Sequence, residues 1–413
     1  MRGGRVVCKL SISLGELLPL RALKVLILLV FSYQQGGKFI ASIILPLRGI
    51  FAMISRLVMD SFKKIVVIGA GTMGQGIAAH LANSSRQVVL LDLKGNGSPN
   101  QIAERALDII KKSDPPLLVE KSRLDCIKPG NLTDDFDEMK DADWIIEAVV
   151  ERIDIKHQLY AKIDQVRSSS SIVSSNTSTI PLSVLTSEMP ESMKSDFCIT
   201  HFFNPVRFMR LLEIVKTPEF DETKMNGLLD FCQKELGKGI VICNDTPGFI
   251  GNRIGVYAMQ VAMYEALDRG LPVEIADALF GRPLGIPKTG VFGLYDLIGI
   301  DLMKDVLASF KKELQPEDPF MDVVKPHPVV EALLDKGYTG NKGPGGFYET
   351  KIVDGEEIVK ALNVTDMSYY DFDKVDLPLA RRVEKEGMKA LLNDDSDYGR
   401  YAFAVFAKII NYS

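Results

Sequence analysis

The sequence contains four histidines, and one of them lies in a setting suited to proton transfer. His201 ends an apolar run that begins at Phe197, and Glu213 lies within the next apolar run, from Leu211 to Val215. If the two runs form neighbouring strands, the carboxylate can hold the imidazole in one tautomer and stabilise its protonated form, as a general base near neutral pH requires. By residue pattern alone, a core histidine bonded to the backbone explains the arrangement equally well.

The other three histidines are weaker candidates for proton transfer. His80 lies inside an amphipathic helical stretch and His157 on a charged one, so both are predicted to be structural or solvated. His327 lies between two prolines in a predicted loop, with no evident partner for chemistry. His201 is therefore the candidate base.

A glycine-rich segment predicts the nucleotide that such a base would work with. The apolar run from Ile65 to Ile68 is followed by GAGTMG and then by an amphipathic stretch, which is typical of a strand, a turn and a helix. The first glycine permits the tight turn, the second lets the backbone approach a pyrophosphate, and the third lets the helix pack close to the sheet. The diphosphate would lie at the positive end of that helix. The predicted contact residues of this turn are Gly69, Gly71, Thr72, Met73 and Gly74.

Asp92 indicates which dinucleotide is preferred. It ends the second apolar run, roughly 20 residues after the turn, where a carboxylate can accept both ribose hydroxyls and would repel a 2′-phosphate. NAD is therefore predicted over NADP. A glycine turn that binds nothing is the alternative, but the strand before it, the helix after it and the acid beyond it argue against that interpretation.

The composition is that of an ordinary globular protein long enough, at 413 residues, for two or three domains. The net charge of −5 gives no indication of a nucleic-acid partner or of a polybasic membrane surface. The five cysteines are scattered without CxxC spacing, which predicts reduced, packed thiols and neither a zinc site nor a disulfide framework.

The first 60 residues differ from the rest and are interpreted as an extension outside the fold. Up to Arg56 they carry eight Lys or Arg and a single acid, Glu16. No apolar stretch reaches the roughly 18 residues needed to cross a bilayer, so no membrane span is predicted. A mitochondrial transit peptide, a membrane-surface segment or an extended start upstream of Met59 remain open. The expected compartment is the cytoplasm, or the mitochondrial matrix if the leader is real.

The pattern of elements predicts two domains and a tail. From 61 to 246 strands alternate with helices, which indicates a Rossmann-type, doubly wound α/β sheet whose ligand crevice lies at the carboxyl ends of its strands. Residues 69–74, 148–151 and 176–178 would all face that crevice. A DTPG cluster then marks a boundary, helical periodicity predicts an all-helical second domain over 247–348, and 349–413 is interpreted as a C-terminal tail with helical stretches.

Several motifs together resemble the 3-hydroxyacyl-CoA dehydrogenases of fatty acid β-oxidation. These motifs are VVIGAGTMGQGIA, DWIIEAVVE, SSNTSTI, THFFNPVRFMRLLEIV, NDTPGFIGNRI and GYTGNKGPGGFYE, and they cover about residues 63–348. HFFNP and DTPGFIGNR are not general features of Rossmann domains, so the resemblance is specific. It implies NAD-dependent oxidation of (S)-3-hydroxyacyl-CoA to 3-oxoacyl-CoA, an acyl-CoA thioester as substrate, and a homodimer formed through the helical domain.

The resemblance also assigns roles to matching residues. His201 corresponds to the catalytic base and Glu213 to the carboxylate that orients it. Ser178 and Asn252 correspond to the groups that hydrogen-bond the 3-oxygen of the substrate, and Asn204 would lie beside the nicotinamide. Three further residues match positions around the cofactor: Asp92, Glu151 and Lys156.

Simpler interpretations exist for four of these residues. Ser178 is also placed to cap the following helix, and Asn252 to hold the turn between the domains. Glu151 is equally explained as a solvated charge at a helix start, and Lys156 as a surface lysine. Lys342, in the glycine-rich loop of the last motif, is a weaker candidate for contact with a CoA phosphate.

Rival functions also remain. A dehydrogenase specialised for 3-hydroxybutyryl-CoA differs in pocket volume, which sequence does not give. A non-catalytic NAD-binding protein on this fold is possible in principle, although the complete set of site residues argues against it. A dehydrogenase of other β-hydroxy acids would leave HFFNP and GFIGNR unexplained. The tail, ending GRYAFAVFAKIINYS, resembles the connector to the hydratase module of bifunctional relatives, but no hydratase activity is inferred.

Overall fold

The computed structural model describes residues 62–281, 289–353, 355–373, 375 and 377–413. The predictions for residues 1–60, including those about compartment, therefore lie outside the described residues. Within the described residues, no helix is long and apolar enough to cross a bilayer.

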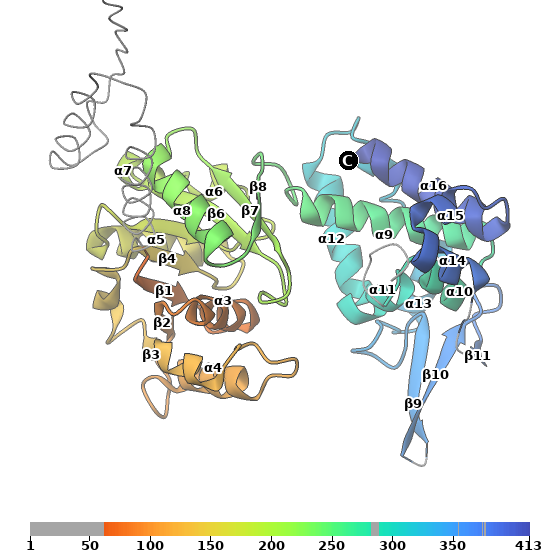
Figure 1. Ribbon diagram of the computed structural model, residues 1–413, viewed down its shortest axis with the longest axis horizontal. Coiled ribbons are helices and arrows are strands. Elements are labelled where there is room, and N and C mark those ends of the chain that lie inside the picture. Colours follow the sequence, from red (N-terminus) through yellow and green to blue (C-terminus); the bar gives the residue numbers. More distant parts are fainter. Residues whose placement is uncertain (1–61, 282–288, 354, 374, 376) are drawn as a thin grey trace, which may run out of the picture. The chain divides into compact units, whose positions relative to one another are not determined.

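An eight-stranded sheet carries the first part of the described chain (Figure 1). Its order is β3-β2-β1-β4-β5-β6-β7-β8, and every neighbouring pair is parallel except β6 and β7. This arrangement confirms the doubly wound, mostly parallel sheet. The strands are β1 (Lys64–Ile68), β2 (Gln87–Asp92), β3 (Ile127–Asn131), β4 (Trp144–Glu147), β5 (Ile172–Ser175), β6 (Phe197–Phe202), β7 (Leu211–Lys216) and β8 (Gly239–Ile242).

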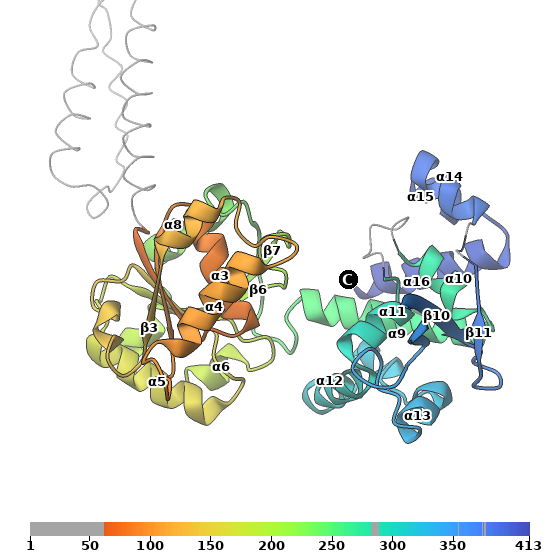
Figure 2. The same ribbon diagram turned by 90° about the horizontal axis from the view of Figure 1, so that it is seen from below.

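Helices cover both faces of this sheet, which is why its central strands, β4 and β5, are buried on both faces and begin with apolar residues (Figure 2). Alternate residues of β1 point to opposite faces: Ile65 packs with α3, α4 and α8, whereas Val66 packs with α5, α6 and α7. The helices are α3 (Thr72–Asn83), α4 (Gln101–Lys112), α5 (Ile153–Val166), α6 (Leu182–Leu185), α7 (Glu191–Lys194) and α8 (Glu222–Lys234), with short 3₁₀ turns η1 (Lys121–Cys126) and η2 (Phe136–Met139).

The antiparallel pair β6 and β7 decides where the candidate base lies. In their register His201 stands directly opposite Glu213, so the two side chains share one face of the sheet. The two runs are neighbouring strands, as the sequence analysis supposed, and β8 lies beyond them at the edge of the sheet.

The second part of the chain is predominantly helical, as predicted. It contains α9 (Gly251–Asp268), α10 (Val273–Leu279), α11 (Phe292–Ile298), α12 (Ile300–Glu313), η4 (Pro319–Asp322), α13 (Pro328–Asp335), α14 (Pro378–Glu386), α15 (Met388–Leu392) and α16 (Asp397–Tyr412). It also contains an antiparallel sheet that the sequence analysis did not predict. Its strands, in the order β11-β10-β9, are β9 (Tyr348–Val353), β10 (Glu356–Leu362) and β11 (Tyr369–Asp371).

The segment interpreted as a tail packs into the core of the helical region. Leu362 of β10 and Tyr401 of α16 are buried in the same hydrophobic cluster as the apolar residues of α9. Tyr412 stacks on Tyr257 of α9 with ring centroids 4.0 Å apart, and the Tyr401 hydroxyl donates to the carbonyl of Ala262. The core therefore continues past residue 348, where the sequence analysis placed a boundary; the domain limits themselves stay predictions.

Four cysteines lie among the described residues, and all four are free thiols. Cys198, Cys232 and Cys243 are buried. The described residues contain no cluster of His, Cys, Asp and Glu that could hold a metal ion.

Candidate active site

His201 and Glu213 form a close, buried pair. Nδ1 of His201 lies 2.7 Å from Oε2 of Glu213, and the residues are 5% and 0% exposed. Because Nδ1 is engaged by the carboxylate, Nε2 is the ring nitrogen available to a substrate. The rings of Phe203 and Phe249 lie 4.4 Å and 5.7 Å from the imidazole and shield it from water.

The second oxygen of Glu213 anchors the start of α9. Oε1 accepts the backbone N–H groups of Ile250 at 2.9 Å and Gly251 at 2.6 Å. Burial alone would raise the pKa of Glu213, but the hydrogen bonds from His201 and from these two N–H groups hold it below its ordinary value. One carboxylate thus orients the imidazole and fixes the turn that carries Asn252. The structure therefore assigns to Glu213 the turn-holding role that was the simpler interpretation of Asn252.

A cavity of about 410 Å³ lies in front of His201. It is lined by residues from the carboxyl ends of β4, β5 and β6 and from the first turns of α3, α5 and α9, as the crevice rule for open α/β sheets predicts. The lining residues are Met73, Ala148, Val149, Glu151, Lys156, Asn176, Ser178, His201, Phe202, Phe203, Asn204 and Asn252. The structure thus brings together seven of the predicted site residues, with Glu213 bonded to His201.

The glycine turn fits a dinucleotide. Gly69 has φ +102°, and a Cβ there would lie 2.4 Å from the carbonyl oxygen of Ala148; a Cβ on Gly74 would lie 1.7 Å from the Gly69 oxygen. These two glycines are required by the turn and by helix packing. Gly71 differs, because nothing lies within 4 Å of the position its Cβ would take. Open space in front of a helix N-terminus that has no side-chain cap is what a diphosphate requires.

Asp92 lies beside this turn, at the end of β2. One of its carboxylate oxygens accepts the N–H of Ala70 at 2.6 Å and the other accepts the N–H of Leu93 at 2.6 Å. The carboxylate is therefore held next to the glycine turn, and each oxygen retains a lone pair for a ribose hydroxyl.

Lys156 is not a surface lysine. It is 1% exposed, and its Nζ lies 2.8 Å and 2.9 Å from the two oxygens of Glu147 and 3.0 Å from Glu151. Glu147 is itself fully buried and also accepts the hydroxyls of Tyr160 and Ser175. Lys156, Glu147 and Glu151 therefore form a charged, hydrogen-bonded network behind the cavity wall.

Glu151 and Ser178 depart from their simpler interpretations as well. The Glu151 side chain, 34% exposed, accepts the N–H of Ser178 at 3.0 Å and the hydroxyl of Thr177. Burial would raise the pKa of Glu151, but the charge of Lys156 and these hydrogen bonds lower it. Because α6 begins only at Leu182, after Pro181, Ser178 is not its cap. Glu151 instead anchors the loop that presents Ser178 to the cavity.

The supporting roles of three residues were not predicted, although Asn176 was expected to face the crevice. Glu147 interrupts the apolar run DWIIEAV, and an acid at a core position was a usable signal. Asn176 accepts the N–H of Phe202 at 2.9 Å and so ties the end of β6 to the loop after β5. Lys238, whose pKa burial lowers to about 8, donates to the carbonyls of Val206 and Met209 and holds the loop after Asn204. The last two act through backbone contacts, which a sequence pattern does not reveal.

The remaining histidines have structural settings. His80 lies 3.1 Å from the carbonyl of Leu236, and burial with the nearby charge of Lys238 lowers its pKa to about 4. His157 contacts the carbonyl of Val184, and His327 caps α13 by accepting the N–H of Val329.

Comparison with known proteins agrees with this geometry. Residues 64–246 match the NAD-binding domain of 3-hydroxyacyl-CoA dehydrogenase, and residues 248–350 match its C-terminal domain. The chain is 40% identical over 353 residues to a putative fatty acid oxidation complex trifunctional enzyme of Rickettsia felis, covering 85% of this chain and 48% of that protein. The chain thus spans about half the length of the curated relatives it matches first.

Shorter relatives are covered over most of their length. A probable 3-hydroxyacyl-CoA dehydrogenase of Deinococcus radiodurans is 36% identical over 289 residues, with 70% of this chain and 82% of the relative covered. Among solved structures, an (S)-3-hydroxybutyryl-CoA dehydrogenase from Ralstonia eutropha superposes with a TM-score of 0.55 at 29% identity, over 68% of this chain and 96% of that one. The chain therefore belongs to the 3-hydroxyacyl-CoA dehydrogenase family.

Proposed function

We propose that this chain catalyses the NAD-dependent oxidation of (S)-3-hydroxyacyl-CoA to 3-oxoacyl-CoA. The observation that carries the proposal is the buried His201–Glu213 pair at a cavity that also receives Ser178, Asn204 and Asn252. A non-catalytic NAD-binding protein would have no need of a buried imidazole–carboxylate pair beside polar groups from three separate elements.

His201 acts as the base. Its Nε2 takes the proton of the 3-hydroxyl as the hydride leaves C3, and the Glu213 carboxylate stabilises the imidazolium that forms. When bound, NAD supplies the nicotinamide carbon that accepts this hydride. Phe203 and Phe249 restrict the access of water to the imidazole, which strengthens its interaction with Glu213.

The cavity wall positions the reacting oxygen and the cofactor. Ser178 and Asn252 hydrogen-bond the 3-oxygen from different elements, a contribution made mainly through orientation. For the cofactor, the space in front of Gly71 and the N-terminus of α3 would hold the diphosphate, and Asp92 the ribose hydroxyls. Lys156 and Glu151 support this wall, and Asn204 lines it.

The proposal is tested by following NADH absorbance with acetoacetyl-CoA and with a long-chain 3-ketoacyl-CoA. Turnover of at least one thioester is expected, with little activity when NADPH replaces NADH. NADH binding without turnover of either thioester would contradict the proposal and favour a non-catalytic role.

A second candidate is specificity for short acyl chains. It is favoured by the similarity to a solved 3-hydroxybutyryl-CoA dehydrogenase. The ratio of kcat/KM for the two thioesters decides: a short-chain enzyme prefers acetoacetyl-CoA by well over tenfold, whereas a general enzyme does not.

We also propose that the chain forms a homodimer through its helical region. Leu297 of α11 and Leu302 of α12 are 54% and 47% exposed although both are large and apolar. Light scattering of the purified chain should give twice the monomer mass, and Leu302→Glu should lower that mass; a monomeric wild type would contradict the proposal.

A further inference from the structure

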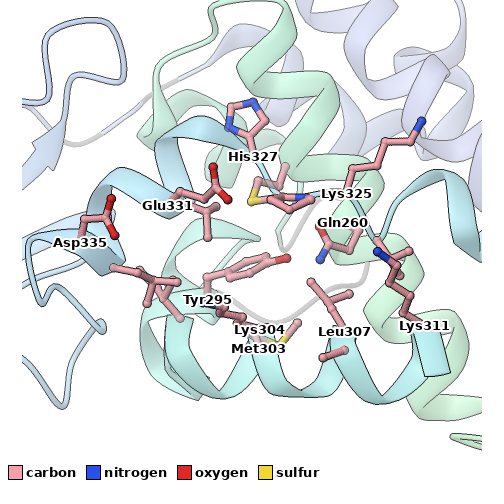
Figure 3. A pocket seen from close by; sticks show the side chains of 17 residues that line it. Gln260, Tyr295, Met303, Lys304, Leu307, Lys311, Lys325, His327, Glu331 and Asp335 are labelled. Atoms are coloured by element: carbon pink, nitrogen blue, oxygen red, sulfur yellow. The ribbon is translucent and has the colours of Figure 1, made fainter. Parts of the chain in front are cut away.

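A second cavity, of about 460 Å³, lies among α9, α11, α12 and α13 (Figure 3). None of its lining residues belongs to the candidate active site. Its volume is in the range of small-molecule sites, roughly 300–1,000 Å³.

Two buried polar atoms at this cavity lack partners among the described residues. They are Oε1 of Gln260 and the hydroxyl oxygen of Tyr295, and both residues are 1% exposed. Burial raises the pKa of Tyr295, so its hydroxyl remains a donor. Buried groups left without a hydrogen-bond partner destabilise the protein, and a bound ligand that supplies the partner would relieve this.

A ligand group that pairs with both atoms must donate a hydrogen bond to Oε1 of Gln260 and accept one from the Tyr295 hydroxyl. Both residues line the cavity, and Figure 3 shows the Tyr295 hydroxyl pointing toward the Gln260 carboxamide. A secondary amide meets this need, because its carbonyl accepts from Tyr295 while its N–H donates to Gln260.

The rest of the cavity suits an aliphatic chain. Its wall includes side chains from α9, α12 and α13, and a methionine pair that can adapt to a flexible ligand. These apolar residues are Met263, Ile300, Met303, Leu307, Val330 and Leu334.

The charged residues at the rim of the cavity favour one orientation of a bound ligand. Lys311 and Lys325 lie on the side of Gln260, whereas Glu331 and Asp335 lie on the opposite side (Figure 3). Both lysines are exposed, and neither forms an ion pair with any described residue. An anionic group is therefore favoured next to the amide, with the aliphatic chain extending the other way.

We propose that this cavity binds an acyl amphiphile in the order anion, amide, aliphatic chain. A phosphate-bearing pantetheine thioester, as in acyl-CoA, has this order. The choice of acyl-CoA as the ligand rests on the proposed function, whereas the existence of the site rests only on the cavity and its unpaired polar atoms. Gln260 and Tyr295 hold the amide, Lys311 faces the phosphates, and the apolar wall holds the acyl chain.

Calorimetric titration with decanoyl-CoA, which has no 3-oxygen to be oxidised, tests the proposal. The wild type should show two binding events, one at each cavity. Tyr295→Phe and Gln260→Leu should each weaken one event about 5- to 10-fold, as expected for one lost hydrogen bond. Lys311→Glu should weaken the same event, whereas Lys312→Glu, an exposed neighbour outside the cavity, should not.

Two further arms identify the ligand and separate the two proposals. Decanoate has a carboxylate but neither the amides nor the phosphates of decanoyl-CoA. If decanoate binds as tightly as decanoyl-CoA, the proposed ligand is wrong. Unchanged decanoyl-CoA titrations in all three cavity variants would overturn the site. Turnover of the thioester that the wild type accepts should be unaffected in these variants. If the wild type turns over neither acetoacetyl-CoA nor the long-chain 3-ketoacyl-CoA but Tyr295→Phe still weakens binding of decanoyl-CoA, the proposed function fails and this site stands.

Discussion

Buried carboxylates have different kinds of partner in the two parts of the chain. In the sheet region Glu147 faces the amine of Lys156, and Glu213 faces the imidazole of His201. In the helical region Asp277 accepts the N–H groups of Phe292 and Gly293 and the hydroxyl of Tyr348. Asp296 likewise accepts the N–H groups of Phe347 and Tyr348.

The difference shows in the pKa values. Hydrogen bonds from His201 and from backbone hold the pKa of Glu213 below its ordinary value despite burial. Burial raises the pKa of Asp277 to about 7 and that of Asp296 to about 6, because their N–H partners do not offset the desolvation. The Glu213 carboxylate, matched with an imidazole at a cavity, indicates chemistry, whereas carboxylates that accept only neutral donors hold the local fold.

The largest expected effect on stability comes from breaking the Lys156–Glu147 pair. Lys156→Met leaves the fully buried Glu147 charge without its cation and should lower the free energy of unfolding by about 3–5 kcal/mol. Urea unfolding measures the loss. The double variant Lys156→Met/Glu147→Gln should regain much of it; a double variant no more stable than the single one would argue against charge pairing as the cause.

The Glu213 carboxylate should matter for rate more than for binding. Glu213→Gln retains a hydrogen-bond acceptor but removes the charge that stabilises the imidazolium, so kcat should fall about 10²-fold. The acid limb of the pH–rate profile should move to lower pH, because the base loses its stabilising charge. An acid limb at the wild-type position would show that Glu213 does not tune His201.

The Asp277 carboxyl should make the helical region less stable as the pH rises. Its folded pKa of about 7 lies above the ordinary 3.8, so its stabilising contribution is complete below the ordinary value and is lost as the pH rises through 7. Asp277→Asn should reduce the loss of stability between those limits by about 1–2 kcal/mol. Thermal unfolding across this range measures it, with exposed Asp305→Asn as the control; equal pH dependence in wild type and Asp277→Asn would contradict the assignment.

The smallest effect is expected at Ser178. In the proposed mechanism Ser178 donates one hydrogen bond to the 3-oxygen, so Ser178→Ala should lower kcat/KM about tenfold without changing the Kd for NADH. Ser183→Ala, on α6 and outside the cavity, serves as the matched control. A tenfold change in the NADH Kd instead would place Ser178 at the cofactor.

Sequence reasoning predicted the sheet region well because its signals are local and periodic. Apolar runs, the glycine turn and the charged helix that carries His157 each depend on neighbouring residues, and the structure reproduces them. The pairing of His201 with Glu213 followed because two strands joined by a short loop place such residues opposite one another.

Burial and contacts that arise only in the folded chain were the part that sequence could not supply. The charge on Lys156 suggested a surface position, but partners 5 and 9 residues upstream bury it. The strands β9 and β10 are half-exposed and lack a continuous apolar run, so the segment was interpreted as a tail. Its packing on α9 depends on residues such as Tyr412, more than 150 positions away from their partners.

The most direct test of the account is the turnover of acetoacetyl-CoA by wild type and His201→Ala, measured with the Kd for NADH in both. The proposed base predicts that kcat falls about 10³-fold while NADH binding is unchanged, and that His157→Ala, on the charged helix α5, retains full activity. Wild-type turnover in His201→Ala would contradict the assignment of His201 as the base and with it the mechanism proposed here.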